Sequence, residues 1–195
     1  MNKHVHAGGT RKIFDDPIAL LRAAGLTQGG TLLDIGTGSG YLAIAAADIM
    51  GPAGKVYALD SHAASVEALQ KEIAARALTT ITALTADANH PLPIPRGTVT
   101  VCLMSNVLHG FAANNETERV MKNINAALAE VAMLIVIDFI PQETGFGPPL
   151  SIRLSPDAVE DLLRPYGYEP GRRFQPGPHH YGLVFKRVPL QDRYC

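Results

Sequence analysis

The chain has 195 residues and a formal net charge of −1, which is the size of one ordinary domain able to bury a full core. No run of Lys or Arg is longer than a pair, and this excludes an extended interface with nucleic acid or an anionic membrane. The two cysteines, Cys102 and Cys195, do not suit a disulfide framework. The sequence shows neither a leader pattern nor an apolar run near ~20 residues, so we expect a cytoplasmic protein. With its near-neutral charge, we expect it to act on a small molecule.

The first elements are a polar segment and a short helix. We expect residues 1–195 to form a single domain, with residues 1–14 as a flexible arm or lid and residues 189–195 as a tail. Asp16 followed by Pro17 is typical of a helix start, because aspartate caps the free N–H groups and proline fits the first turn. The predicted helix, residues 17–24, ends at Gly25.

A glycine-rich turn follows the first predicted strand. The apolar run Thr31–Ile35 is followed by Gly36, Gly38 and Gly40, and an Ala-rich helical pattern covers Tyr41–Met50. Glycine allows a positive φ and leaves room for a ligand to lie against the backbone. The segment therefore predicts a strand, a tight turn that binds a cofactor, and a helix N-terminus.

The second predicted strand, residues 55–59, ends on an acid. Asp60 follows Gly40 by twenty residues, and in a βαβ unit an acid at this place lies beside the first turn, where it can accept the hydroxyls of a ribose. A dinucleotide fingerprint G-x-G-x-x-G would need a third glycine at Tyr41. The spacing therefore predicts an adenosine-containing ligand and disfavours NAD.

Strand and helix patterns then alternate along the chain. Ser61 is expected to cap a helix that runs to about Ala77. The remaining predicted elements are a strand at Ile81–Thr85, a strand at 99–104, a helix at 116–128 and a strand at 129–140. This alternation predicts a parallel sheet with helices on both faces and a ligand site at the carboxyl ends of its strands.

The C-terminal part adds a loop, a helix and a hairpin. Residues 141–149 are rich in Gly and Pro, and a helix is expected from Ser155-Pro156 to about Gly167. Two β-like runs, 168–174 and 181–188, are close enough for an antiparallel hairpin. His179 and His180 lie between them, but no metal-binding spacing occurs in the sequence, so no metal site is expected.

The pattern D-x-G-x-G-x-G, from Asp34 to Gly40, resembles motif I of the class I S-adenosylmethionine-dependent methyltransferases, and the resemblance continues over residues 14–188. It implies an α/β fold, a Rossmann-like three-layer α/β/α sandwich with a mostly parallel seven-stranded sheet and a C-terminal antiparallel hairpin. It also implies that S-adenosyl-L-methionine is the cofactor, S-adenosyl-L-homocysteine the product, and in-line transfer to a small-molecule acceptor the reaction.

The resemblance carries over to individual positions. The residues that it implies for cofactor binding are Asp34, Gly36, Thr37, Gly38, Gly40, Asp60, Ser61, Asp87, Ala88, Ser105 and Asn106. The candidates for substrate contact are Phe14, in the place of a lid, with Phe146, Arg153 and His180. His109 follows the fourth strand and is either a general base or a packing histidine.

Several alternatives stay open at this point. The same cofactor residues fit a module that binds S-adenosylmethionine without turnover, as a sensor or partner subunit. An NAD-dependent oxidoreductase is a weaker alternative, disfavoured by Tyr41 and the terminal hairpin. The accepting atom, whether O, N, S or C, is undetermined, and so is the formation of a homodimer.

Overall fold

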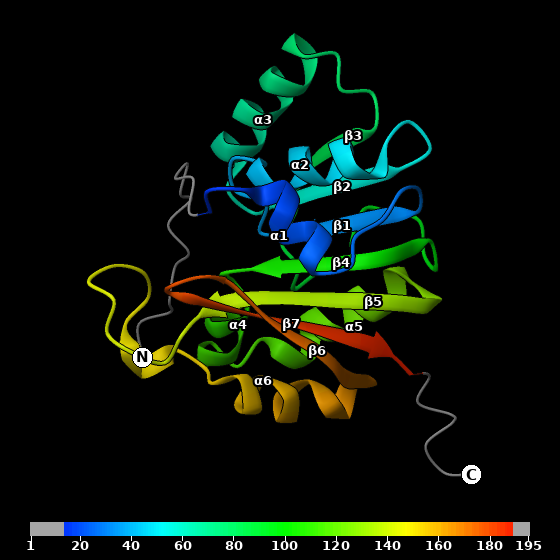
Figure 1. The fold of residues 1–195 in the computed structure, drawn as a ribbon. Coiled ribbons are helices and arrows are strands. Elements are labelled where there is room, and N and C mark those ends of the chain that lie inside the picture. Colours follow the sequence, from blue (N-terminus) through cyan, green and yellow to red (C-terminus); the bar gives the residue numbers. More distant parts are fainter. Residues whose placement is uncertain (1–13, 189–195) are drawn as a thin grey trace.

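The computed structural model describes residues 14–188 and contains one seven-stranded sheet. The strand order is β3-β2-β1-β4-β5-β7-β6 (Figure 1). The strands are β1 Thr31–Ile35, β2 Lys55–Asp60, β3 Ile81–Thr85, β4 Val99–Ser105, β5 Leu128–Phe139, β6 Tyr168–Gly177 and β7 His180–Arg187. The predicted N-terminal arm, except Phe14, and the predicted tail with Cys195 lie outside the described residues.

The direction of the strands confirms the predicted sheet. Strands β1 to β5 pair in parallel, whereas β7 is antiparallel to both β5 and β6. The C-terminal hairpin is therefore present, with β7 inserted between β5 and β6. The register pairs Phe139 with His180, so the tight turn after β6 brings a histidine to the carboxyl end of β5.

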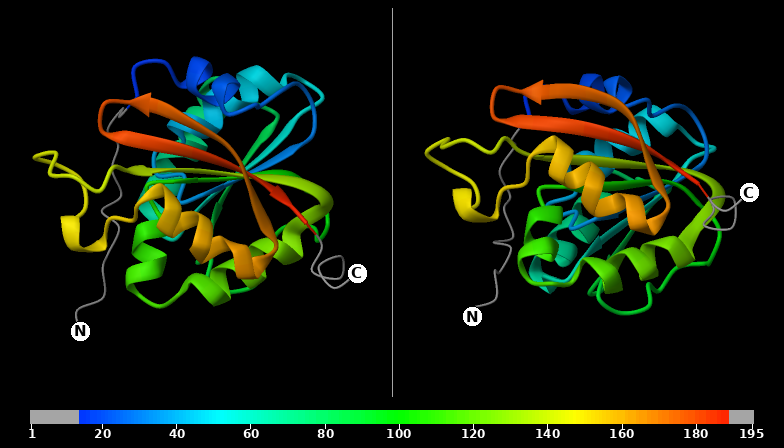
Figure 2. Two further views of the ribbon diagram at one scale, coloured as in Figure 1. Left: turned by 60° about the horizontal axis from the view of Figure 1, so that its bottom comes forward. Right: turned by 90° about the horizontal axis from the view of Figure 1, so that it is seen from below.

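Helices cover both faces of the sheet, as the alternation predicted. The first group, on one face, is α1 Pro17–Ala23, α2 Tyr41–Met50 and α3 Ala63–Ala75, and the second is α4 Leu108–Ala113, α5 Thr117–Ala127 and α6 Pro156–Leu163. Figure 2 shows α1 and α2, in blue and cyan, on the opposite side of the sheet from the green and orange helices α4 to α6. The α/β/α sandwich is confirmed.

Two separate cores follow from the period of two along each strand. Leu32 packs with the first group of helices and its neighbour Leu33 with the second. In the same way Leu103 belongs to the first core, while Cys102 and Met104 belong to the second. Continuous apolar strands, with both faces buried, therefore fix the centre of the sheet.

Two of the three predicted helix caps are confirmed. The Asp16 side chain accepts a hydrogen bond from the Ala19 N–H at 2.8 Å, and Ser155 does the same for Ala158 at 3.1 Å. The prediction that Ser61 caps α3 is wrong: the N-cap residue is His62, and it makes no side-chain cap bond. The reason is that Asp60 Oδ1 accepts from the His62 N–H at 2.9 Å, which keeps the chain extended for one more residue.

The order in which the chain adds strands reverses beside β1, and this determines where a ligand can bind. From β1 the chain crosses first to β2 and β3 on one side, and then returns to β4 on the other side. The loops after β1 and β4 therefore diverge, and a crevice opens between them at the carboxyl ends of the strands. No helix within residues 14–188 has the length and apolar character needed to span a bilayer.

Candidate functional site

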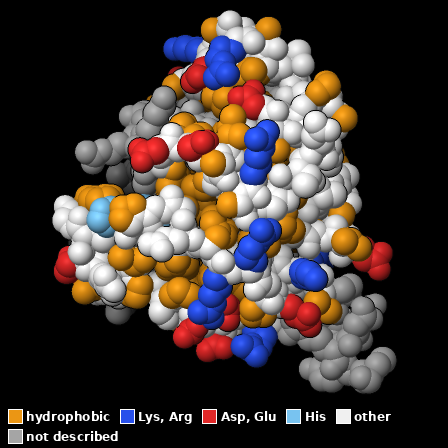
Figure 3. Space-filling model, in the orientation of Figure 1, with side chains coloured by type: hydrophobic (Ala, Val, Ile, Leu, Met, Phe, Trp, Pro, Cys, Tyr) orange, Lys and Arg blue, Asp and Glu red, His pale blue; other side chains and the backbone are white. Residues whose placement is uncertain are grey.

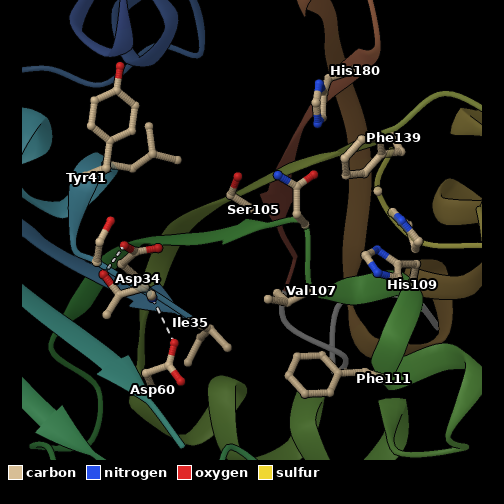
Figure 4. A pocket seen from close by; sticks show the side chains of 18 of the residues that line it. Asp34, Ile35, Tyr41, Asp60, Ser105, Val107, His109, Phe111, Phe139 and His180 are labelled. Carbon is tan, nitrogen blue, oxygen red and sulfur yellow. Dashed lines mark hydrogen bonds between the residues drawn. The ribbon is translucent and has the colours of Figure 1, made fainter. Parts of the chain in front are cut away.

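A cavity of about 1080 Å³ lies at the carboxyl ends of the parallel strands. Its lining comes from the turns after β1, β2, β3 and β4, from the end of β5, from the loop after β5 and from the β6–β7 turn. Figure 4 shows Asp34, Asp60 and Tyr41 on one side, His109, Phe139 and His180 on the other, and Ser105 and Val107 between them. We call these sides the acidic half and the aromatic half.

The glycine turn forms the floor of the acidic half. Gly36, Gly38 and Gly40 all have positive φ angles of 71°, 55° and 76°. A Cβ atom on Gly36 would lie 2.4 Å from Val107 Cγ1, and one on Gly40 would lie 2.2 Å from Leu69 Cδ1. Glycine is therefore required at these two positions by packing as well as by backbone angle, a requirement that the motif alone does not reveal.

Asp34 is a buried carboxyl at the end of β1, with 2% of its surface exposed. Thr37 Oγ1 donates a hydrogen bond of 2.6 Å to Asp34 Oδ2. The pKa of Asp34 is raised to about 7: burial raises it most, the Thr37 hydrogen bond lowers it, and the charge of Asp60 raises it. A cationic group in the cavity would stabilise the ionised form of this carboxyl.

Asp60 joins the end of β2 to the glycine turn. Its Oδ2 accepts a hydrogen bond from the Gly38 N–H at 2.8 Å, while its Oδ1 accepts from His62. The βαβ spacing therefore predicted the position of this carboxylate beside the turn correctly. Each carboxylate oxygen keeps lone-pair capacity with which it can accept a ligand hydroxyl.

Asp87 and Ala88 follow β3 and also line the cavity. Asp87 Oδ1 accepts from the backbone and side-chain N–H groups of Asn89, at 2.9 and 3.0 Å. It is thus a turn-forming aspartate as well as a cavity residue. Ser61 lines the cavity too, although it does not cap α3.

Ser105 ends β4, and Asn106 follows in the left-handed region with a φ of 58°. The Asn106 N–H donates to the Ile137 carbonyl at 2.8 Å, which fixes the turn against β5. Among residues 14–188, the buried Asn106 Oδ1 has no hydrogen-bond partner. Asparagine tolerates this backbone region, so the strained turn presents a carboxamide at the cavity.

His109 lies at the start of α4 and is held by Asp138, the penultimate residue of β5. Its Nδ1 lies 2.8 Å from Asp138 Oδ1, and its backbone N–H donates to Asp138 Oδ2 at 3.2 Å. Both side chains are buried, at 3% and 1% exposure. Asp138 was missing from the predicted site residues, although an acid within the apolar strand 134–139 was a usable signal.

The aromatic half is formed by rings from four segments. Phe139 and His180 lie 4.2 Å apart between ring centroids, and Phe14 approaches His180 edge-on at 5.0 Å. Phe146, from the loop after β5, contacts Phe139 at 5.7 Å. Three predicted substrate residues therefore meet in this half, and Phe139 is an addition that only the antiparallel register makes evident.

Tyr41 ties the N-terminal segment to the site. Its hydroxyl donates a 2.5 Å hydrogen bond to the Phe14 carbonyl oxygen, and both residues line the cavity. The sequence indicated Tyr41 only as the residue that breaks a dinucleotide fingerprint. In the structure it holds the predicted lid residue, Phe14, in place.

Arg153 was predicted to contact substrate, and the structure places it outside the cavity lining. Its guanidinium donates to the carbonyls of Pro148 and Phe146, each at 2.9 Å, and also to that of Gln142. It lies 5.0 Å from the centroid of the Phe139 ring. These contacts fix the shape of the loop that carries Phe146.

Within the described residues no three His, Cys, Asp or Glu side chains are grouped to hold a metal ion. The described lining of the cavity also contains no Lys or Arg. The polar side-chain groups on the described lining are therefore carboxylates, amides, hydroxyls and imidazoles. Such a set suits an organic ligand with hydroxyl groups and a positive charge.

Known proteins are similar to this chain in sequence and in fold. A family model described as "Methyltransferase domain" matches residues 32–130. The crystal structure of a SAM dependent methyltransferase from Aquifex aeolicus is similar with a TM-score of 0.81 and 27% identity, and the match covers 90% of this chain and 91% of that one.

Two curated relatives match over shorter segments. A protein named "Probable cobalt-precorrin-6B C(15)-methyltransferase (decarboxylating)" from Pyrobaculum aerophilum is 47% identical over 49 residues, which are 25% of each chain. A "Protein-L-isoaspartate O-methyltransferase" from Ignicoccus hospitalis is 32% identical over 74 residues, 38% of this chain and 35% of that protein. The matches thus span about a quarter and a third of these relatives.

Proposed function

Because this chain belongs to the family of S-adenosylmethionine-dependent methyltransferases, we propose that it transfers a methyl group from that cofactor to a small molecule. The observation that supports this most directly is the two-sided cavity. Its acidic half offers carboxylates beside a glycine turn, and its aromatic half holds a buried histidine that is oriented by an aspartate.

The acidic half fits S-adenosylmethionine chemically. Asp60 would accept the ribose hydroxyls, and Asp34 would face the positively charged methionine end, directly or through water. Asp87 and Ala88 would border the adenine, and the backbone of Ser105 and Asn106 would border the methionine. The bound cofactor supplies an electrophilic methyl group, and the chain's own residues position and deprotonate the acceptor.

His109 is the proposed general base. A carboxylate accepts a hydrogen bond from Nδ1–H, so Asp138 favours the tautomer in which Nε2 is the basic nitrogen. An O–H or N–H acceptor that takes the methyl must lose a proton, and Nε2 is the place for it. Asp138 then stabilises the imidazolium and acts as a positioning residue.

A small acceptor is favoured by the shape and charge of the protein. The cavity, at about 1080 Å³, is at the upper limit of ~1,000 Å³ for small-molecule sites, so it can hold the cofactor together with a small acceptor. Figure 3 shows basic side chains dispersed over one face with acidic side chains among them. A polyanion binds to a continuous basic stripe instead.

The test begins with thermal unfolding in the presence of S-adenosylmethionine, S-adenosylhomocysteine or NADH. At about 100 times the dissociation constant, a ligand adds ~2.7 kcal/mol and raises the midpoint by roughly 5 to 10 °C. We expect shifts with the two sulfur compounds only, reduced in Asp60→Ala. A shift with NADH alone would contradict the proposal.

Transfer is tested next by incubating the protein with S-adenosylmethionine labelled at the methyl group and a panel of small O–H, N–H and S–H acceptors. Label recovered in one acceptor would support the enzyme. Cofactor binding without transfer to any acceptor would favour the alternative, a binding module that acts as a sensor or partner subunit. His109→Ala serves as the variant that should bind cofactor normally and transfer slowly.

A further inference from the structure

The aromatic half of the cavity offers flat apolar surfaces at a common site. Besides the contacts of His180 with Phe139 and Phe14, the Phe146 ring meets His179 edge-on at 5.1 Å between centroids. All these rings line the cavity, and Phe146 is 42% exposed. Aromatic side chains that line a cavity beside an exposed ring can pack against a planar ligand.

Two buried polar atoms of residues that line the cavity have no partner among the described residues. His180 is 3% exposed, and its buried Nε2 makes no hydrogen bond with any residue from 14 to 188; the same holds for Asn106 Oδ1. Burying a polar group without a partner costs free energy, so each atom favours a ligand that pairs with it. An amide oxygen can only accept, and a deprotonated imidazole nitrogen also accepts.

The imidazole of His180 is neutral at physiological pH. Its pKa is lowered to about 4: burial lowers it most, the charge of Asp138 opposes this, and those of His179 and Arg153 add to the lowering. A neutral ring cannot serve as the counter-ion of an anionic substrate. In the tautomer that carries its proton on Nδ1, the ring can accept a hydrogen bond at Nε2 from a donor on a ligand.

The charge of the lining argues against an anionic acceptor. Asp15, Asp34 and Asp60 line the cavity, and its described walls contain no Lys or Arg. Among residues 14–188, Arg153 approaches the Phe139 ring, and it donates its hydrogen bonds to backbone carbonyls of the loop after β5. An acceptor carrying a carboxylate or phosphate would therefore be desolvated without a counter-ion.

We infer that the methyl acceptor is an uncharged planar ring bearing an N–H or O–H donor, packed against Phe139 with its donor hydrogen-bonded to His180 Nε2. This inference rests on the proposed function, because it assigns the acceptor to the half of the cavity that the cofactor would not occupy. His180 is then a specificity-determining residue. The remaining acceptor atom, Asn106 Oδ1, would receive a second donor.

The test uses calorimetric titration of the protein saturated with S-adenosylhomocysteine, with three probes of one shape. The probes are indole, a neutral ring with an N–H donor; 1-methylindole, which lacks the donor; and indole-3-carboxylate, which adds a negative charge. We expect indole to bind about tenfold more tightly than 1-methylindole, because only indole pairs the buried nitrogen. The carboxylate should bind more weakly than indole.

Two variants assign the preference to His180. His180→Phe keeps a planar ring without Nε2, so indole and 1-methylindole should bind within about threefold of each other. His180→Gln places an amide oxygen near the former position of Nε2 and should restore part of the preference. Both variants should bind S-adenosylhomocysteine as the wild type does, which shows that they are folded.

The outcomes separate this inference from the proposed function. Failure of the wild type to bind S-adenosylhomocysteine would overturn the proposed function itself. If S-adenosylhomocysteine binds normally, three results would overturn the acceptor class alone. They are equal affinity for indole and 1-methylindole, no binding of either, and tightest binding of indole-3-carboxylate. An unchanged tenfold preference in His180→Phe would remove His180 from recognition.

Discussion

The acidic and aromatic halves of the cavity are assembled in different ways. In the acidic half, the contacts that fix Asp34 and Asp60 join residues 3 and 22 positions apart, all within a single βαβ unit. In the aromatic half, His109 is held by Asp138, 29 positions away, and Phe139 meets His180 through an antiparallel strand pair. Cofactor binding thus depends on a local motif, and acceptor binding on the tertiary assembly of distant segments.

Burial has the same effect in both halves: it penalises the charged form of a titratable side chain. Burial raises the pKa of the Asp34 carboxyl to about 7 and lowers that of the His180 imidazole to about 4. In each case burial shifts the equilibrium toward the uncharged form. A cationic cofactor would reverse this at Asp34, whereas a neutral acceptor leaves His180 uncharged.

The largest expected effect comes from filling the glycine turn. Gly36→Ala places a methyl group 2.4 Å from Val107 Cγ1 at a φ of 71°, so it combines backbone strain with a clash. We expect a loss of about 3–5 kcal/mol in the free energy of unfolding and no measurable binding of S-adenosylhomocysteine. Urea unfolding and calorimetry measure the two effects.

Gly29→Ala is the matched control for that change. Gly29 has a φ of 75° and no atom within 4 Å of its missing Cβ, so alanine there introduces only the backbone strain. It should cost about 1–2 kcal/mol and leave the binding of S-adenosylhomocysteine unchanged. Equal losses in the two variants would show that contact with Val107 is unimportant.

The next largest effect should reduce methyl transfer without changing the binding of S-adenosylhomocysteine. Asp138→Asn keeps the size of the side chain but no longer favours Nδ1–H on His109, so the rate of transfer should fall by about 10²- to 10⁴-fold. The affinity for S-adenosylhomocysteine should stay within about twofold, since the hydrogen bonds that Asp138 accepts come from His109 and Phe139 in the aromatic half. The measurement is single-turnover transfer with an acceptor identified in the labelling screen. An unchanged rate would restrict the pair to a structural role.

The same contrast explains how much could be predicted from the sequence. Asp60 was placed correctly because its spacing from Gly40 is fixed by one βαβ unit, and the hairpin because its strands are adjacent in the chain. The role of Asp138 could not be predicted in this way, because it depends on the contact between the end of β5 and His109 in α4.

Errors and omissions arose where neighbouring groups compete for one side chain or backbone N–H. The cap expected at Ser61 was displaced because Asp60 takes the His62 N–H. Arg153 was predicted to face substrate, and instead it donates to the carbonyls of its own loop. Neither competition is visible in spacing or hydrophobic pattern, because both depend on side-chain directions in irregular segments.

A smaller effect is expected from the pH dependence of Asp34. Its pKa is about 7 in the folded protein and near 3.8 when unfolded, so between these values the folded state binds more protons and stability falls as pH rises. Relative to Asp34→Asn, the wild type should lose about 2–3 kcal/mol between pH 5 and pH 8. Urea unfolding of both proteins at the two pH values measures this. Parallel pH profiles would mean that Asp34 titrates normally.

The smallest effect concerns the stability of the aromatic half without ligand. His180→Phe removes a buried nitrogen that has no partner among the described residues, so it should raise the free energy of unfolding by about 1 kcal/mol at pH 7.5. The gain should grow by about 1–2 kcal/mol at pH 5: the lowered pKa means that wild-type stability is lost as pH falls from 6.5 toward 4. Denaturant unfolding of both proteins at the two pH values tests this. A destabilised variant would show that His180 contributes to the fold through its imidazole, whereas a stabilised one that has lost its preference for indole would show that the chain keeps a costly buried nitrogen for its ligand.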